Sequence, residues 1–223
     1  MNSNLFLLFL SLISIDLAGQ RAQTVTDIDG NIYKTVTIGT QLWMAENLKV
    51  THFRNGEAIP NITDSMSWSN LSKGAYCYYD TLKINIPVYG LLYNWYAVID
   101  SRNICPANWH IPGHAELVTL TDFLGGEHIA GAKLKEKGFV HWRRPNAGAT
   151  NETGFTGLPA GFRSYEAVFY DLGYYGFWWC SSKGSEGDAW GYGMYYFYGD
   201  VNMDSNEKTN GFSVRCVKDL SVP

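Results

Sequence analysis

The chain has 223 residues, of which 46% are hydrophobic and 17% are charged, a balance typical of a globular protein. Its 17 basic and 21 acidic residues give a net charge of −4 without a basic stripe, which disfavours nucleic-acid binding. A chain of this length can form one domain that buries about 70% of its unfolded surface.

The first residues resemble an export signal. An apolar stretch at 5–15 has the length of a signal-peptide core and is too short to span a bilayer. Small residues at Ala18, Gly19 and Ala22 offer cleavage points, although no Lys or Arg precedes the stretch. We predict a signal peptide at 1–22, no membrane span, and a mature protein that is secreted or held at the cell surface.

Residues 24–100 are predicted to form short strands joined by turns. Asp29-Gly30-Asn31 can supply the positive φ angles of a tight reversal, and period-two alternation over 32–38 predicts a strand. The stretch closes with Y-G-L-L-Y-N-W-Y-A at 89–97.

The clearest predicted helix begins at Gly113. Gly113 can serve as its N-cap, and Glu116 places a carboxylate in the first turn, where it favours the helix start. Two glycines at 125–126 end the helix, and a second helix is predicted over 129–137. Apolar residues at helical spacing mark the first helix: Leu117, Leu120, Phe123 and Leu124.

Two histidines and a carboxylate follow the spacing H-x(3)-H-x-E at His110, His114 and Glu116. The spacing resembles the iron-binding triad of sulfoxide synthases, and such ligands can hold a redox metal with open positions. The predicted helix start separates the two histidines, so one helix does not present both. We expect no metal here and a hydrogen-bonding role for His110.

Aromatic residues dominate the stretch from Tyr165 to Tyr198, where 14 of 34 residues are Phe, Tyr or Trp. Such rings either fill a core or form a rigid contact surface suited to stacking on sugars. Successive strand residues point to opposite faces, so at most one of Trp178 and Trp179 is expected to be exposed. Trp190 lies among glycines and is expected on an exposed loop. The predicted ligand-binding residues are Trp190, Tyr192, Tyr195 and Tyr196.

Oxygen-bearing side chains then alternate, as in the first half of a calcium loop, at Asp200, Asn202, Asp204 and Asn206. Ser205 stands where such a loop needs Gly, and Gly211 stands where it needs a bidentate Glu. We therefore expect a polar connection between a strand at 195–198 and a final strand at 212–217. Calcium binding is left open.

Four cysteines, Cys77, Cys105, Cys180 and Cys216, allow three disulfide pairings. None has C-x-x-C spacing, which argues against a structural zinc site. Disulfides are expected in an exported protein, but the residues alone do not choose the pairing.

The segment D-I-D-G-N-I-Y-K-T-V-T-I-G-T-Q-L-W-M-A-E-N-L at 27–48, together with 89–97, resembles the Fibrobacter succinogenes major paralogous domain (FISUMP). This is a family of secreted and surface proteins of bacteria, and the resemblance covers nearly all of the mature chain. It implies a disulfide between Cys105 and Cys216. Family members usually carry Ser or Thr at the position of Cys180, so that thiol is expected to be free or intermolecular.

A second, more distant resemblance rests on two short motifs. I-P-x-x-A-E-L at 111–117 and G-F-S-V-R-C at 211–216 are similar to landmarks of the formylglycine-generating family. That family implies an α+β, C-type-lectin-like fold, with two helices packed on short irregular antiparallel sheets and paired chain ends. Its enzymes bind copper with two close cysteines, whereas Cys180 and Cys216 are distant in this sequence.

Together these features predict one globular domain at 23–219 followed by a tail at 220–223. We expect it to be an exported binding or adhesion module without enzyme activity or cofactor. Its expected partner is an extracellular glycan or a surface protein. Two alternatives stay open, a metal-dependent oxidoreductase similar to formylglycine-generating enzymes and a purely structural surface protein.

Overall fold

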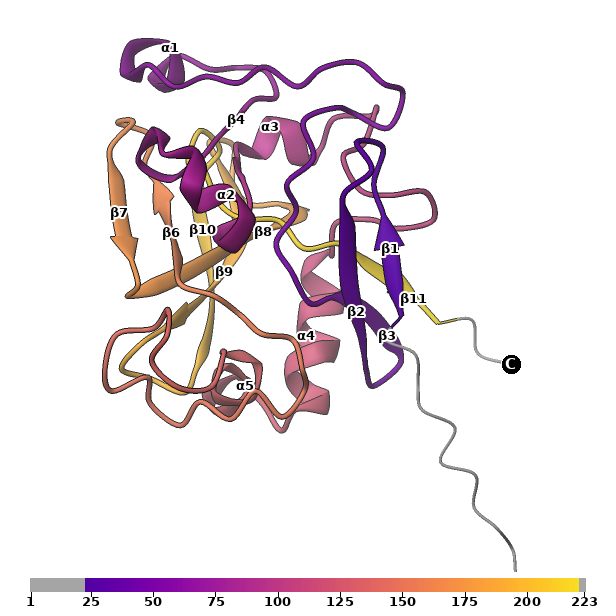
Figure 1. Ribbon diagram of the computed structural model, residues 1–223, viewed down its shortest axis with the longest axis vertical. Coiled ribbons are helices and arrows are strands. Elements are labelled where there is room, and N and C mark those ends of the chain that lie inside the picture. The colour runs from indigo at the N-terminus through magenta and orange to yellow at the C-terminus, as the bar shows by residue number, and fades with distance from the viewer. Residues whose placement is uncertain (1–22, 221–223) are drawn as a thin grey trace, which may run out of the picture.

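The computed structural model describes residues 23–220, and the predicted signal peptide at 1–22 lies outside the described residues, as do 221–223 (Figure 1). The protein is α+β, with short strands and few helices. Figure 1 places a four-stranded sheet on the right and a five-stranded sheet on the left, with the longest helices across the lower part. No helix among residues 23–220 is long and apolar enough to cross a membrane.

Eleven strands make three sheets in the described part of the chain. The four-stranded sheet, in spatial order, contains β1 (Thr24–Thr26), β2 (Ile32–Ile38), β3 (Gln41–Met44) and β11 (Val217–Asp219). The five-stranded sheet contains β10 (Val201–Glu207), β9 (Asp188–Tyr195), β8 (Tyr175–Lys183), β6 (Ala160–Arg163) and β7 (Phe169–Leu172). The smallest pairs β4 (Tyr76–Cys77) with β5 (Leu92–Tyr93). The helices are α1 (Ser65–Ser69), α2 (Ile86–Tyr89), α3 (Trp95–Val98), α4 (His114–Phe123) and α5 (Glu127–Leu134), with 3₁₀ turns at Tyr79–Thr81 and Lys83–Asn85.

The two ends of the domain meet in the four-stranded sheet. β11 runs antiparallel to β3, with Val217 opposite Trp43. A disulfide joins Cys105, in the loop before α4, to Cys216, next to β11. This is the pairing that the family resemblance implied.

Helix α4 begins as the sequence predicts. Gly113 is the N-cap, and its backbone N–H donates to Glu116 Oε2 at 2.7 Å, which satisfies one of the free donors of the first turn. Helix α5 differs from the prediction of 129–137, since it begins at Glu127 and ends at Leu134. It ends early because Lys135 turns to an extended conformation, which directs its side chain into the interior.

Lys135 is fully buried and binds the turn that follows β9. Its ammonium donates to the carbonyl oxygens of Ala147, Tyr195 and Tyr198 at 2.6–3.0 Å. Burial lowers the pKa of Lys135 to about 8. The Lys135 ammonium thereby links the end of α5 to the loop at Ala147 and to the turn at 195–198.

Helix α5 also lies against the connection between β9 and β10. The backbone N–H of Ala132 donates to Gly199 O at 2.8 Å. A Cβ on Gly131 would fall 2.2 Å from Asp200 O, so only glycine permits this approach.

The inner face of the five-stranded sheet forms a core with α4 and α5. Trp178, Met194 and Leu120 belong to this core, and the first two are wholly buried. Trp179 points to the opposite face, as predicted, but it is also 0% exposed because Phe212 covers it at a ring distance of 4.4 Å. Both tryptophans are therefore structural.

Candidate functional site

The four predicted ligand-binding residues are not brought together, because they divide between the two faces of the sheet. Trp190 and Tyr192 lie on the inner face of β9, which packs against α4. Trp190 is half-buried within a strand rather than on the expected loop, and its ring lies 4.8 Å from that of His114. Tyr192 is 1% exposed and stacks on Trp178 at 5.4 Å. Its ring is closed off from solvent, which corrects its assignment to a contact surface.

Tyr195 and Tyr196 lie at the end of β9 and are both partly exposed. Tyr195 faces outward and contacts Tyr175 at a ring distance of 4.8 Å. Tyr196, in the following turn, contacts Tyr174 at 5.2 Å and Phe197 at 4.8 Å. These two predicted residues therefore belong to one continuous group of rings.

That group extends across the outer side of the five-stranded sheet, and we call it the aromatic face. Phe162 contacts Tyr170 at 5.5 Å and Phe177 at 5.1 Å, and Phe177 contacts Tyr195 at 5.9 Å. Tyr170 is 41% exposed and Phe197 is 36% exposed, while the others are half-buried. The aromatic face consists of Phe162, Tyr170, Tyr175, Phe177, Tyr195 and Phe197. Tyr196 contacts these rings but packs against the inner core and is not counted in the aromatic face.

Glycine and polar residues occupy the rest of this side of the sheet. Gly193 lies opposite Phe177 in the β8–β9 register, and a Cβ there would fall 2.9 Å from the Phe177 ring. On the neighbouring strand, Asn202 lies opposite Gly193 and Asp204 opposite Gly191, so both point outward. A row of amide and carboxylate groups therefore runs along one edge of the rings.

Sequence reasoning missed Phe162, Tyr170, Tyr175, Phe177 and Phe197 as candidates. Strand parity could have found part of the set. In W-G-Y-G-M-Y at 190–195 the two glycines and Tyr195 share one face, which leaves room for rings from the paired strand. Phe162 and Tyr170 carry no such signal, because sheet order alone places them beside Phe177.

The calcium-loop hypothesis does not fit the backbone. Residues Val201–Glu207 form β10 and pair with β9 over their whole length. Side chains at every second position of a strand form a row instead of converging on one ion. The polar connection expected between strands at 195–198 and 212–217 is thus corrected: β9 ends at Tyr195, 201–207 form a strand, and the final strand is Val217–Asp219.

The three candidate metal ligands do not all meet in the structure, because His114 lies apart from His110 and Glu116. His114 Nδ1 is buried without a hydrogen-bond partner and its ring packs on Trp190, whereas His110 Nε2 lies 2.6 Å from Glu116 Oε1. Asp219 completes a group whose ligand atoms all lie within 4.8 Å of one another. Both Glu116 oxygens already accept hydrogen bonds, from His110 and from Gly113 N–H, so the contact explains the hydrogen-bonding role expected of His110.

The remaining cysteines lie apart in the interior. Cys77 belongs to a small cluster with Trp68, while Cys180 lies in the core under α4. Burial raises the pKa of the Cys77 thiol to about 12 and also raises that of Cys180. Because Cys216 is in a disulfide, it does not form a thiol pair with Cys180.

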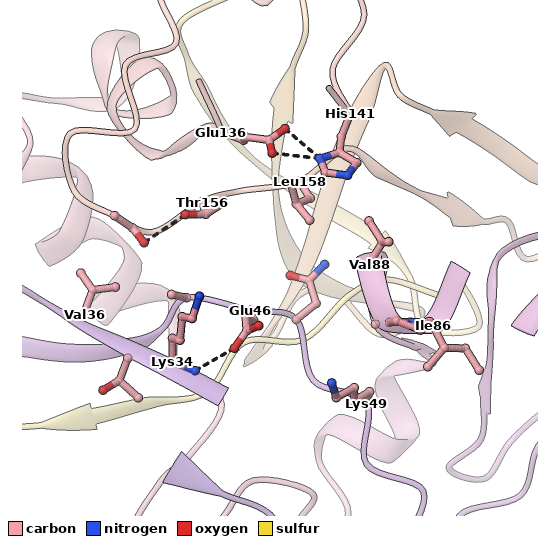
Figure 2. Close-up of a pocket in the computed structure, with 16 residues that line it drawn as sticks. Lys34, Val36, Glu46, Lys49, Ile86, Val88, Glu136, His141, Thr156 and Leu158 are labelled. Carbon is pink, nitrogen blue, oxygen red and sulfur yellow. Dashed lines mark hydrogen bonds and ion pairs between the residues drawn. The ribbon is translucent and has the colours of Figure 1, made fainter. Parts of the chain in front are cut away.

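A cleft of about 550 Å³ opens beside β2, with further walls from the segment after β3, helix α2 and the chain between α5 and β6 (Figure 2). Its lining comes from five chain segments, namely 34–36, 45–49, 86–90, 136–141 and 154–158. His141 Nδ1 contacts both oxygens of Glu136 at 2.9 and 3.0 Å, and Figure 2 shows this pair on the wall opposite Lys34 and Lys49. No sequence motif predicts the cleft, because the segments that line it come together only in the folded chain.

Comparison with family models gives a match over most of the chain. The family model of the Fibrobacter succinogenes major domain matches residues 36–218. No curated protein and no solved structure matches the chain. The match begins within β2 and ends within β11, so it includes the five-stranded sheet, the aromatic face and most of the cleft, whereas β1 lies outside it. The chain therefore belongs to the Fibrobacter succinogenes major domain family.

Proposed function

We propose that this protein is an exported, non-catalytic binding module that holds a glycan chain on its aromatic face. The observation that carries the proposal is the continuous row of partly exposed rings on one side of a sheet. Rings held by a sheet lose little conformational entropy on binding, and their apolar faces stack on the C–H faces of sugars.

Contacts between the rings make the aromatic face rigid before any ligand arrives. Tyr175 packs against Tyr195 at 4.8 Å and against Phe197 at 6.3 Å, so each ring restrains the next. Lys135 holds the carbonyls of Tyr195 and Tyr198 at 2.8 and 2.6 Å and so fixes the turn at the end of β9. A preorganised surface binds more tightly because less ordering is needed.

The polar row beside the rings favours a glycan over a purely apolar partner. Asn202 and Asp204 point to the same side of the sheet as Tyr195. Their amide and carboxylate groups can hydrogen-bond sugar hydroxyls while the rings cover the apolar faces. The combination matches the amphipathic surface of an extended saccharide.

A C-type-lectin-like architecture is part of the proposal. It is supported by the pairing of β3 with β11 and by two helices packed on the sheets. The Cys105–Cys216 disulfide adds a further link between the helical region and the final strand. In this arrangement the aromatic face lies on the outer side of the larger sheet.

The test is retention on insoluble cellulose, xylan and chitin, followed by a glycan array, for the wild-type protein and the triple variant Tyr170→Ala/Tyr195→Ala/Phe197→Ala. We expect at least about a tenfold loss of binding, because stacking on several rings is removed. The matched control is Trp190→Ala, an aromatic substitution on the inner face of the same sheet, which should keep glycan binding. Equal retention of the triple variant and wild type, or no retention of either, would refute the proposal.

A further inference from the structure

Two lysines and two glutamates line the cleft, and a buried arginine behind it brings the number of cations to three. Lys34 and Lys49 line it, and neither has a carboxylate at ion-pair distance within residues 23–220. The Glu46 carboxylate lies between the two lysines. Its Oε2 accepts a hydrogen bond from the backbone N–H of Lys34 at 2.7 Å instead of pairing with either ammonium group. Figure 2 shows both lysine side chains at the lower wall, on the side of the β2–β3 hairpin.

A third cation lies behind the cleft. Arg215 is fully buried, and the groups that accept its hydrogen bonds are neutral, namely Asn47 Oδ1 at 2.8 Å, Thr156 O at 2.8 Å and Phe155 O. Asn47 and Thr156 both line the cleft, so this guanidinium lies directly beneath its surface. The Glu46 carboxylate attracts Arg215 through space but makes no hydrogen bond with it. A buried cation held by neutral groups raises the electrostatic potential above it, since the interior screens charge poorly.

The opposite wall presents hydrogen-bonding groups for hydroxyls. Glu136 holds His141 through Nδ1, and the Tyr89 ring packs edge-on against the imidazole at 5.7 Å. His141 Nε2 makes no hydrogen bond with another described residue and is available to a ligand. The fixed imidazole and carboxylate can therefore orient a polar ligand.

Apolar side chains form the remaining surface of the cleft. Val36 comes from β2, Val88 from α2 and Leu158 from the loop before β6, and Figure 2 shows all three at its border. These groups can cover one apolar side of a small ring. The cleft thus combines ammonium groups, a hydroxyl-binding wall and apolar contact.

We propose that this cleft is a binding site for a hydroxylated carboxylate, with hexuronic acid residues of acidic glycans as the representative ligand. The carboxylate binds Lys34 and Lys49, where it balances the charge that Arg215 adds from below. Hydroxyls bind Glu136, His141 and the Thr156 region, while the ring contacts Val36 and Leu158. The site is distinct from the aromatic face and does not depend on the function proposed for it.

The experiment is calorimetric titration of the protein with oligosaccharides of galacturonate and glucuronate, beside their methyl esters and the corresponding neutral oligosaccharides. We expect binding of a free acid, at least about a tenfold loss on methyl esterification, and weakening by added salt. The double variant Lys34→Gln/Lys49→Gln should lose affinity to a similar extent. The variant Lys34→Arg/Lys49→Arg keeps both charges and should keep most of the affinity.

The matched control is Lys73→Gln/Lys183→Gln, which removes the same charge from exposed positions outside the cleft. It should bind the acids as the wild type does. Equal affinity for acid and ester, unchanged binding by the Lys34→Gln/Lys49→Gln variant, or no binding of any uronate would each overturn the proposal. The triple variant of the aromatic face should bind uronates normally, so failure of one site is distinguishable from failure of the other.

Discussion

Strands β8 and β9 carry aromatic residues on both faces of one sheet, and the two faces differ in their access to solvent. On the inner face Trp178 and Tyr192 stack at 5.4 Å and are 0% and 1% exposed. On the outer face Tyr175 and Tyr195 pack at 4.8 Å yet keep part of their surface free. The same residue types therefore fill a core at Trp178 and Tyr192 and stay partly exposed at Tyr175 and Tyr195.

The difference arises from what covers each face. Helices α4 and α5 pack on the inner face, whereas the outer face is covered only in part, where Phe212 lies against Trp179, Phe177 and Phe162. An aromatic-rich stretch is thus not itself a binding surface, and strand parity together with the neighbouring elements decides the role of each ring.

The largest effect is expected on the inner face. Trp178→Ala should lower the free energy of unfolding by about 3–5 kcal/mol, because a fully packed indole is lost and a cavity remains. The indole N–H also donates to Asn47 Oδ1 at 2.8 Å, which would lose that donor. Urea denaturation measures the change, and a loss below about 1 kcal/mol would contradict the assignment of Trp178 to the core.

A smaller effect is expected at the residue that holds the turn between the two faces. Lys135→Met should destabilise the protein by roughly 2–3 kcal/mol at neutral pH, because three buried carbonyls lose their donor. The loss is measured by urea denaturation.

The cost of Lys135→Met should also depend on pH. The pKa of Lys135 is lowered from 10.5 to about 8, so between these values the unfolded chain binds a proton that the native protein does not. Wild-type stability relative to the variant should therefore increase as pH rises from 8 to 9.5, by about 1.4 kcal/mol per pH unit at most. If the difference in unfolding free energy between wild type and variant stays constant or decreases over this pH range, the lowered pKa of Lys135 is contradicted.

On the outer face, Gly193→Ala should cost about 1–2 kcal/mol. The new methyl group would meet the Phe177 ring at 2.9 Å and force it to move. Gly187→Ala is the matched control, because a Cβ at that exposed position meets nothing within 4 Å. Thermal unfolding compares the two variants. Equal melting temperatures would show that the Phe177 ring accommodates the added methyl group without strain.

The smallest change in stability is expected for Tyr170→Ala, at or below about 0.5 kcal/mol, since Tyr170 is 41% exposed at the edge strand β7. Glycan binding should nevertheless weaken severalfold. Urea denaturation and a binding isotherm on the same sample separate the two effects. A destabilisation comparable to that of Trp178→Ala would place Tyr170 in the core and end the distinction between the faces.

Much of the fold could be predicted from local signals. Gly113 and Glu116 marked the start of α4 correctly, because capping depends on residues three apart. The family resemblance implied the Cys105–Cys216 pairing that the structure contains. The end of α5 was wrong by three residues, since the burial of Lys135 depends on carbonyls more than ten positions away.

The candidate site was only partly predictable. Tyr195 and Tyr196 are both partly exposed and both contact Tyr175, whereas Tyr192 was expected at the surface and is buried. Its exposure depends on α4 and α5 covering that face of β9, which no property of the W-G-Y-G repeat encodes. Phe162 and Tyr170 join the aromatic face only through the spatial order of the strands.

By itself, the sequence determined the family, the α+β composition, the start of α4 and the aromatic richness of 165–198, because each depends on residue type and near neighbours. The tertiary structure alone decided which rings face solvent and brought Lys34, Glu136 and Arg215 around one cleft. Burial and charge proximity are properties of contacts between distant segments, and such contacts exist only after the sheets and helices have packed.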